Sequence, residues 1–342
     1  MKKFLSLLLA AAIAFSAVAC GNTDVAEPTV EPTEVVEEAV YPVTVTDQLG
    51  REVTIESEPE TLVSGYYIST SIIISLGLES KMVGIEAKAD KRNIYKLAAA
   101  ELIELPNVGT AKEFDLEGCA ALNPDLVVLP AKLKDVIPSL EELGIAVIAV
   151  KPEDDELLQE AVEIIAKATN TEEKGQELLT YIDSKLDELD NSLNEVEEPT
   201  VYLASNSSIL STAADEMYQD TLIENAGGVN VADEIGEGDW AEVSYEQIIT
   251  WNPDYIILAA DADYTVEDVL NDTNLASCNA VVNQNVYQFP SDIEAWDSPI
   301  PGSVLGNLWL ASVLHGEEYA ADNYEQAVVE FYETFYGFTP EM

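Results

Sequence analysis

Two short apolar runs recur in the two halves of the chain, each after the same helical pattern. Leu126–Leu129 and Tyr255–Leu258 are partly β-branched, which is typical of a strand covered on both faces. An Asn-Pro-Asp triplet directly precedes each run, and the proline ends the preceding helix because it has no N–H and disfavours helical geometry in the residue before it. Each copy is therefore predicted to be a helix, a tight turn and a buried strand, and the chain to contain two similar halves.

Strand and helix periods alternate through both halves. Val43–Thr46 and Glu52–Ile55 alternate around a Gly-containing turn and predict a hairpin. The further strands expected are Thr61–Ser64, Met82–Ile85, Leu126–Leu129, Ala146–Val150, Val201–Ala204, Tyr255–Ala259 and Val286–Phe289. The helices expected between them are Ser69–Leu76, Asn93–Ile103, Asp115–Leu122, Leu133–Leu143, Asp215–Asn225, Ser244–Trp251, Val266–Leu270, Ser303–Leu314 and Tyr324–Phe335. Such alternation predicts an α/β fold with mainly parallel sheets and helices on their faces.

One segment has helical spacing over a much greater length than the others. Apolar residues recur at this period through roughly forty residues between 153 and 198, with a weakening near Thr169–Thr171, and Pro199 closes the segment. We therefore expect an N-terminal lobe over 41–152, a connecting helix over 153–198 and a C-terminal lobe over 199–342.

A glutamate stands six residues before the Asn-Pro-Asp triplet in each half. Asp115 and Ser244 are good N-cap residues, which places Glu117 and Glu246 in the first helical turn, and Gln247 completes the pattern of a capping box. A carboxylate there gains roughly 0.3–1 kcal/mol from the helix dipole, which explains either glutamate taken alone. Their matched register favours a functional role, since the two would project from equivalent places on two lobes.

The chain resembles the class III substrate-binding proteins of ATP-driven importers for iron–siderophore complexes, haem and vitamin B12. The resemblance runs from about Tyr41 to Phe335 and is carried by Val43-Thr-Val-Thr-Asp-Gln-Leu-Gly-Arg-Glu-Val-Thr-Ile55, by Asp115-Leu-Glu with the following Asn-Pro-Asp-Leu-Val-Val, and by Trp240-Ala-Glu-Val-Ser-Tyr-Glu-Gln. It implies two Rossmann-like lobes joined by one long α-helix, a ligand cleft between the lobes and small closing motions. In the vitamin B12 member, a glutamate in each corresponding segment docks into permease arginines. The resemblance therefore implies this role for Glu117 and Glu246.

The first 19 residues are predicted to be a secretion signal. Two lysines precede the apolar stretch Phe4–Ala19, which is slightly short for a spanning helix of ~20 residues. A cysteine at the cleavage point is typical of a lipobox, so Cys20 is expected to become the lipidated N-terminus. Ala17 stands where a leucine is usual, and ordinary cleavage that leaves a spare cysteine is the alternative. The rest of 20–40 is rich in Glu, Pro, Thr and Val and predicts a flexible tether.

Composition narrows the classes of function. The formal net charge of −50 argues against nucleic-acid binding, which needs a basic surface. The chain has one histidine, His315, for which we expect a structural role, and Cys119 and Cys278 are expected to be small buried residues. These counts argue against a bare Zn or Mn site built from several histidines. No nucleophile elbow, phosphate loop or His-based metal motif is present, so we expect neither an enzyme nor a bound cofactor.

Positive charge is confined to one part of the chain. All fifteen Lys and Arg residues lie at or before Lys185. Ligands of open α/β sheets lie beyond the carboxyl ends of the strands. In the loops placed there we expect contact with an anion from Lys88, Arg92, Lys112 and Lys132. Solvated loop lysines are the alternative, which we favour for Lys91 and Lys134.

Four aromatic residues fall in the same loops and would offer flat surface to a large ligand, although packing explains each of them equally well: Tyr66, Tyr67, Trp240 and Trp296. Trp240 aligns with a tryptophan that contacts the ligand in the vitamin B12 relative.

We therefore expect a monomeric receptor, lipid-anchored on the outer face of a bacterial cell membrane. It would capture an anionic iron complex, such as a ferric catecholate or hydroxycarboxylate siderophore, and deliver it to an ABC permease dimer with its ATPase. Haem is an alternative that the Tyr66–Tyr67 pair keeps open. A corrinoid is disfavoured by Ala111, where the vitamin B12 relative has tryptophan, and an oxyanion such as molybdate is a further alternative. A different class would be a surface interaction protein or cell-wall enzyme on a two-lobe scaffold.

Overall fold

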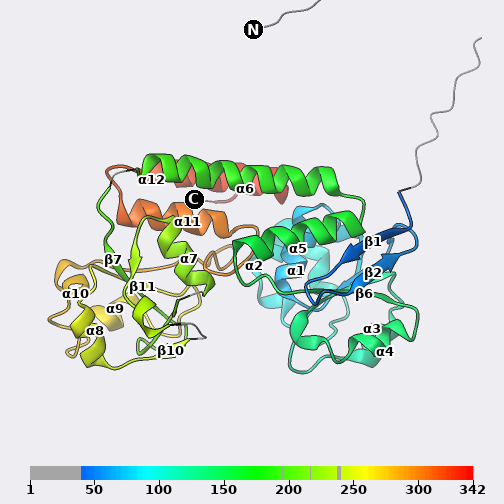
Figure 1. The fold of residues 1–342 in the computed structure, drawn as a ribbon, viewed down its shortest axis with the longest axis horizontal. Coiled ribbons are helices and arrows are strands. Elements are labelled where there is room, and N and C mark those ends of the chain that lie inside the picture. Colours follow the sequence, from blue (N-terminus) through cyan, green and yellow to red (C-terminus); the bar gives the residue numbers. More distant parts are fainter. Residues whose placement is uncertain (1–39, 195, 216, 237–239, 342) are drawn as a thin grey trace, which may run out of the picture. The chain divides into compact units, whose positions relative to one another are not determined.

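The computed structural model describes residues 40–194, 196–215, 217–236 and 240–341. The predicted signal, Cys20 and the tether up to residue 39 lie outside the described residues. From Val40 onward the chain forms one compact unit. Within it two α/β lobes lie along one long helix, α6 (Figure 1).

The first lobe contains a hairpin and a parallel four-stranded sheet. The hairpin pairs β1 (Val43–Thr46) with β2 (Glu52–Ile55), as the alternation predicts. The sheet has the order β4-β3-β5-β6, with all neighbours parallel. Its strands are β3 (Leu62–Ser64), β4 (Met82–Gly84), β5 (Leu126–Pro130) and β6 (Ala146–Val150). The helices of this lobe are α1 (Tyr67–Ser75), α2 (Asn93–Ala98), α3 (Leu116–Ala121), α4 (Ile137–Glu141) and α5 (Asp155–Ala168).

The second lobe repeats this plan with a larger, mixed sheet. The strand order is β10-β8-β7-β11-β12, β9 also pairs with β7, and β7, β11 and β12 run parallel. The strands are β7 (Thr200–Ala204), β8 (Ser211–Thr212), β9 (Val229–Asn230), β10 (Ala241–Glu242), β11 (Tyr255–Leu258) and β12 (Val286–Gln288). The helices are α7 (Tyr218–Asn225), α8 (Tyr245–Trp251), α9 (Val266–Leu270), α10 (Asn279–Asn283), α11 (Ser303–Leu314) and α12 (Ala321–Phe335). The sequence analysis did not predict β8, β9, β10 or α10. The three strands have two residues each, which is too short to show alternation, and α10 is a helix of five residues.

The central strand β5 is covered on both faces, as its continuous apolar run predicts. Leu126 and Val128 pack into one apolar cluster, while Val127 and Leu129 pack into a second cluster on the other face. All five residues of the strand are buried. Burial on both faces removes the need for alternation and explains why the strand is apolar throughout.

The two Asn-Pro-Asp triplets have the same local structure. In each, the asparagine has a left-handed backbone, with φ of 48° in the first copy and 51° in the second. The aspartate then accepts a hydrogen bond from a threonine at the start of the neighbouring strand. Thr61 directly precedes β3, and Thr200 is the first residue of β7. Asp125 Oδ2 accepts the Thr61 hydroxyl at 2.8 Å, and Asp254 Oδ2 accepts the Thr200 hydroxyl at 2.7 Å. The same contact in each lobe confirms that the halves are structural repeats.

The long helical segment is two helices rather than one. α5 ends at Ala168 and α6 (Glu172–Ser192) begins after a three-residue turn at the predicted weakening. Asn170 in this turn has a left-handed backbone with φ of 56°, which ends α5. The Thr169 hydroxyl donates to the Ile165 carbonyl at 2.8 Å, so the last turn of α5 is closed by a side chain.

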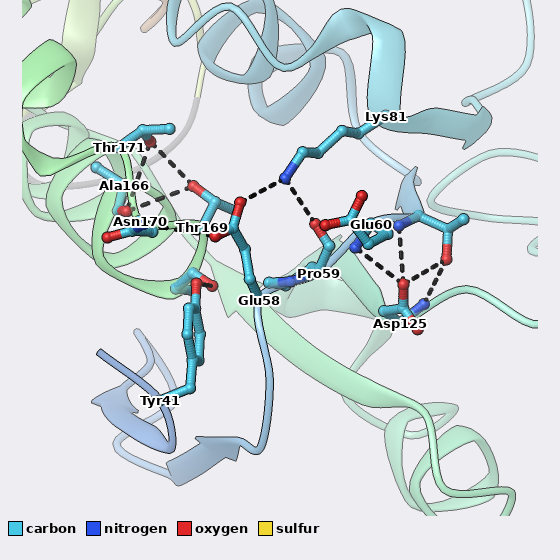
Figure 2. A network of polar contacts seen from close by, with 12 residues as sticks. Tyr41, Glu58, Pro59, Glu60, Lys81, Asp125, Ala166, Thr169, Asn170 and Thr171 are labelled. Carbon is cyan, nitrogen blue, oxygen red and sulfur yellow. Dashed lines mark hydrogen bonds and ion pairs between the residues drawn. The ribbon is translucent and has the colours of Figure 1, made fainter. Parts of the chain in front are cut away.

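Figure 2 shows how this turn is attached to the start of the first lobe. The Tyr41 hydroxyl donates to the Ala168 carbonyl at 3.1 Å, and Glu58 pairs with Lys81 at 2.8 Å. The Asn170 amide reaches the other Glu58 oxygen at 3.5 Å. The α5–α6 turn is thus held by residues that lie just outside the strands of its own lobe.

α6 is therefore the single helix through which the chain passes from the first lobe to the second. The Gln159 amide of α5 donates to Asp183 of α6 at 2.9 Å, and the Tyr181 hydroxyl of α6 donates to the Ala327 carbonyl of α12 at 3.1 Å. Figure 1 shows α6 and α12 together along one side of the two lobes. Within the described residues no helix is both long and apolar enough to cross a bilayer.

Candidate functional site

Tyr66 and Tyr67 lie where the carboxyl end of β3 meets α1 and separate two cavities. Their rings meet edge to face, with centroids 5.2 Å apart and planes at 75°. Tyr66 lines a cavity of about 390 Å³ within the first lobe, and Tyr67 lines a cavity of about 230 Å³ between the lobes. We call these the lysine cavity and the inter-lobe cavity. Both lie beyond the carboxyl ends of parallel strands, where α/β sheets bind ligands.

The lysine cavity has a cationic rim on an apolar wall. Its wall includes Leu49, Tyr66, Ala111, Pro130, Val150 and Pro152. Its rim carries Lys132, Lys134 and Lys151, all exposed, and Glu153, which pairs with Lys151 at 2.5 Å. Three lysines and one glutamate leave a net charge of +2. In a molecule of formal charge −50, this region attracts anions.

The inter-lobe cavity brings one cation against the second lobe. Arg92 enters from the first lobe, and its guanidinium carbon lies 4.0 Å from the centroid of the Tyr67 ring. This distance is within the range of a cation–π contact. From the second lobe come Asn206, Asp261, Glu294 and Ser298.

Glu86 holds Arg92 in this position. The Glu86 side chain is buried and lies 3.5 Å from Arg92 Nε. Its carboxylate accepts the Thr70 hydroxyl at 2.7 Å and the Tyr95 hydroxyl at 2.7 Å. Burial raises the pKa of Glu86, while the two hydroxyls and Arg92 lower it. Arg92 is thus positioned by a carboxyl behind it and an aromatic face beneath it.

Glu294 links the lobes across the same cavity. It accepts the Tyr332 hydroxyl at 2.9 Å and the Ser71 hydroxyl at 3.3 Å. Ser71 lies on α1 of the first lobe and is also 2.8 Å from the Tyr336 hydroxyl. Burial raises the pKa of Glu294 to about 7, against the lowering effects of these hydroxyls and of Arg92.

The structure brings together only part of the predicted anion site. Lys132 lines the lysine cavity, and Arg92 lines the inter-lobe cavity. Lys88 and Lys112 are exposed and line neither of them. Lys134, which was expected to be solvated, is exposed, and it lies on the rim of the lysine cavity with Lys132.

The sequence analysis did not consider Lys151. It follows the last residue of β6 directly, so its place at the carboxyl end of a strand was the available signal.

The four predicted aromatic residues have different surroundings. Tyr66 and Tyr67 line the two cavities. Trp240 is half-buried against the main apolar cluster. Trp296 is 5% exposed, and its indole N–H donates to Tyr332 at 2.9 Å. Trp296 therefore has the packing role that was the alternative for each aromatic residue.

Glu117 and Glu246 are exposed in the first turns of α3 and α8. The predicted caps are confirmed, since Asp115 accepts the N–H of the third helical residue at 2.9 Å and Ser244 does so at 3.2 Å. The predicted capping box is not formed, and the Gln247 amide nitrogen donates to Glu234 at 3.3 Å. Figure 1 shows α3 and α8 on the side of their lobes away from α6. Within the described ranges neither glutamate carboxylate has a hydrogen bond or ion pair.

The structural roles expected for the cysteines and the histidine are confirmed. Cys119 and Cys278 are free and buried in separate apolar clusters. His315 is buried, with Nε2 3.0 Å from the Gly227 carbonyl oxygen. Among the residues that the structure describes, no group of three or more His, Cys, Asp or Glu is placed to hold a metal ion.

Comparisons with known proteins agree with this architecture. A family model described as periplasmic binding protein matches residues 62–293. The molybdate-binding protein MolA of Haemophilus influenzae is 26% identical over 319 residues, covering 85% of this chain and 90% of that protein. The solved structure of MolA bound to molybdate matches with a TM-score of 0.76 at 25% identity, covering 87% of this chain and 99% of that one.

Two proteins of Bacillus subtilis are each 26% identical to the chain. The ABC transporter substrate-binding lipoprotein YvrC matches over 76% of this chain and 82% of its own length. The Fe(3+)-citrate-binding protein YfmC matches over 73% of this chain and 78% of its own length. The chain thus belongs to the periplasmic binding protein family, as a substrate-binding protein of the class III type that serves ABC importers.

Proposed function

We propose that this substrate-binding protein captures an anionic iron chelate at the two cavities beside Tyr66 and Tyr67. The observation that carries the proposal is the rim of Lys132, Lys134 and Lys151 over an apolar wall. Three ammonium groups at one cavity favour a ligand with several carboxylate or phenolate oxygens. Arg92 adds a forked donor on the far side of the tyrosine pair, which suits a carboxylate.

Size supports a compact chelate. Ligand pockets commonly have volumes of ~300–1,000 Å³. The lysine cavity of about 390 Å³ adjoins the inter-lobe cavity of about 230 Å³ at the tyrosine pair. A ferric hydroxycarboxylate complex is of this scale, and the relative YfmC is named for binding Fe(3+)-citrate.

Molybdate is a second candidate, favoured by a specific observation. MolA, which binds molybdate, is similar to 85% of this chain. A small oxyanion needs only a few N–H groups and lysines, which either cavity supplies. Haem and corrinoids have less support, because the burial of Trp296 removes one of the flat surfaces that they would use.

The ligand proposal is tested by calorimetric and tryptophan-fluorescence titration with ferric citrate, a ferric catecholate, molybdate, haemin and cobalamin. We expect binding of a ferric chelate, and we expect the triple substitution K132Q/K134Q/K151Q to weaken it more than tenfold, or about 1.4 kcal/mol. The control K96Q/K167Q/K174Q removes the same charge from exposed lysines outside both cavities and is expected to bind normally. Equal weakening in both variants, or no response to any compound, would contradict the proposal.

We also propose that Glu117 and Glu246 dock the loaded protein onto the permease. Two unpaired carboxylates on the same side of two lobes suit a symmetric partner with two basic pockets. Their exposure and their matched cap geometry support this role. Lipid attachment at Cys20 would hold the receptor near that partner, and the relative YvrC is named as a lipoprotein.

A further inference from the structure

Glu294 is a titratable group in the inter-lobe cavity with no cation at ion-pair distance in the described part of the chain. Its side chain is 9% exposed, and the hydroxyls of Ser71 and Tyr332 satisfy it without supplying charge. A Cβ added at Gly302 would lie 2.2 Å from Glu294 Oε1, so the carboxyl packs directly on the backbone. The carboxyl is therefore enclosed by protein and faces the ligand cavity.

Other charged or titratable groups line the cavity or lie close to Glu294 or Arg92. They are Tyr67 of α1, Glu86 after β4, Arg92 and Tyr95 at the start of α2, Asp261 after β11, Tyr332 of α12, Tyr336 just after α12, and Asp297 in the same loop as Glu294. Burial raises the tyrosine pKa values far above neutrality. Near pH 7 the groups that decide the charge are thus Arg92 and the carboxyls.

One proton on Glu294 changes the net charge of the residues that line the cavity. Among its lining residues, Arg92 contributes +1, and Asp261 and ionised Glu294 contribute −1 each, which sums to −1. With Glu294 protonated the sum is zero. An anion that reaches Arg92 is repelled by the ionised carboxylate, so it binds the protonated protein more tightly.

We propose that the protein takes up its anionic ligand together with a proton, which it places on the Glu294 carboxyl. Glu294 is then a residue that sets specificity, because its protonation state decides whether an anion is accepted beside Arg92. The inference depends on the proposed function as an anion receptor. In this binding step, one ligand and one proton are taken up from solvent. The only covalent bond formed is the O–H bond of the Glu294 carboxyl.

The direction of the pH dependence follows from linkage. Below the pKa of Glu294 in the free protein, which is about 7, the carboxyl already holds its proton and affinity does not change with pH. Above it, each ligand must bring a proton, so affinity falls with rising pH by up to about tenfold per pH unit.

Calorimetry of ferric citrate binding in buffers of different ionisation enthalpy measures the proton directly. At pH 7.5 wild-type protein is expected to take up on the order of three quarters of a proton per ligand. The variant E294Q is expected to take up no proton, and its affinity for the ligand is expected to be the same at pH 6 and pH 8. E101Q, which alters an exposed carboxyl that does not line the cavity, is expected to retain the uptake of the wild type. Molybdate is the probe if ferric citrate does not bind.

The outcomes separate the two proposals. Binding without proton uptake, or uptake that persists in E294Q, overturns the role of Glu294 and leaves the anion receptor standing. Failure of every anionic compound to bind wild-type protein overturns both. If E294Q does not fold, infrared difference spectra of wild-type protein with carbon-13 glutamate decide the matter, since ligand must increase the protonated-carboxyl band. An unchanged band overturns the inference.

Discussion

At the scale of single residues, the two cavities carry charge differently. The three lysines of the lysine cavity are exposed, whereas the inter-lobe cavity has the half-buried Arg92 and the buried Glu294. Glu86 and Glu294 each accept hydrogen bonds from two hydroxyl groups. Glu86 lies beside Arg92, and Glu294 lines the same cavity as Arg92. A carboxyl that is removed from water and given only neutral donors favours its protonated form. Composition could not reveal this, because nothing in the sequence distinguishes the buried members of its 65 acidic residues, Glu86 and Glu294 among them, from the exposed ones.

The stability of E294Q relative to the wild type should depend on pH. The folded-state pKa of Glu294 is raised from 4.5 to about 7, so its stability contribution is complete below pH 4.5 and is lost as pH rises through 7. Glutamine has no proton to lose. Between pH 5 and 8 the unfolding free energy of E294Q should therefore increase relative to the wild type by about 2–3 kcal/mol. Urea unfolding at several pH values measures this, and a difference that is constant with pH would contradict it.

At the scale of elements, most strands and helices follow from local pattern. The hairpin, β6, α9 and α11 begin and end at the predicted residues. Local pattern predicted one long helix where the structure has α5 and α6. The same helical period continues on both sides of the break at Thr169–Thr171, so the period alone does not reveal two helices. An asparagine with positive φ ends α5, and the contacts of Figure 2 hold the turn.

Asn170 should therefore tolerate glycine better than alanine. Its φ of 56° lies in the left-handed region, where a Cβ without a compensating side-chain contact costs ~1–2 kcal/mol. We expect N170A to lower the unfolding free energy by about 1 kcal/mol and N170G to be close to neutral. Chemical denaturation of the pair measures the difference. Equal stability of the two variants would show that the backbone at this turn is not under the inferred constraint.

At the scale of the whole molecule, the two repeated lobes carry α3 and α8 on one side and share α6 and α12 on the other (Figure 1). The repeat has a physical basis in the Thr–Asp contact of each lobe, which fixes the turn after α3 and after α8 in the same way. Glu117 and Glu246 consequently leave their lobes from matching positions.

Charge reversal tests the docking role at this scale. The double variant E117K/E246K should abolish uptake of radiolabelled ferric citrate, or of molybdate, by cells that carry the cognate permease. The affinity of the purified variant for the same ligand should be unchanged, because neither residue lines a cavity. E173K/E325K reverses exposed glutamates on α6 and α12 and is the matched control, expected to support normal uptake. Uptake by E117K/E246K equal to that of the control would refute docking.

The sequence by itself determined the two-lobe α/β plan, the helix caps and the family, because these depend on local periodicity, proline and short motifs. It also determined that Lys and Arg are absent from the second lobe, because none follows Lys185. Only the tertiary structure decided which charges meet. Lys134 and Lys151 line the lysine cavity with Lys132, whereas Lys88 and Lys112 line neither cavity. Trp296 is buried in the core. The reason is that cavities and buried carboxyls form from residues far apart in the chain, whose distances no local pattern encodes.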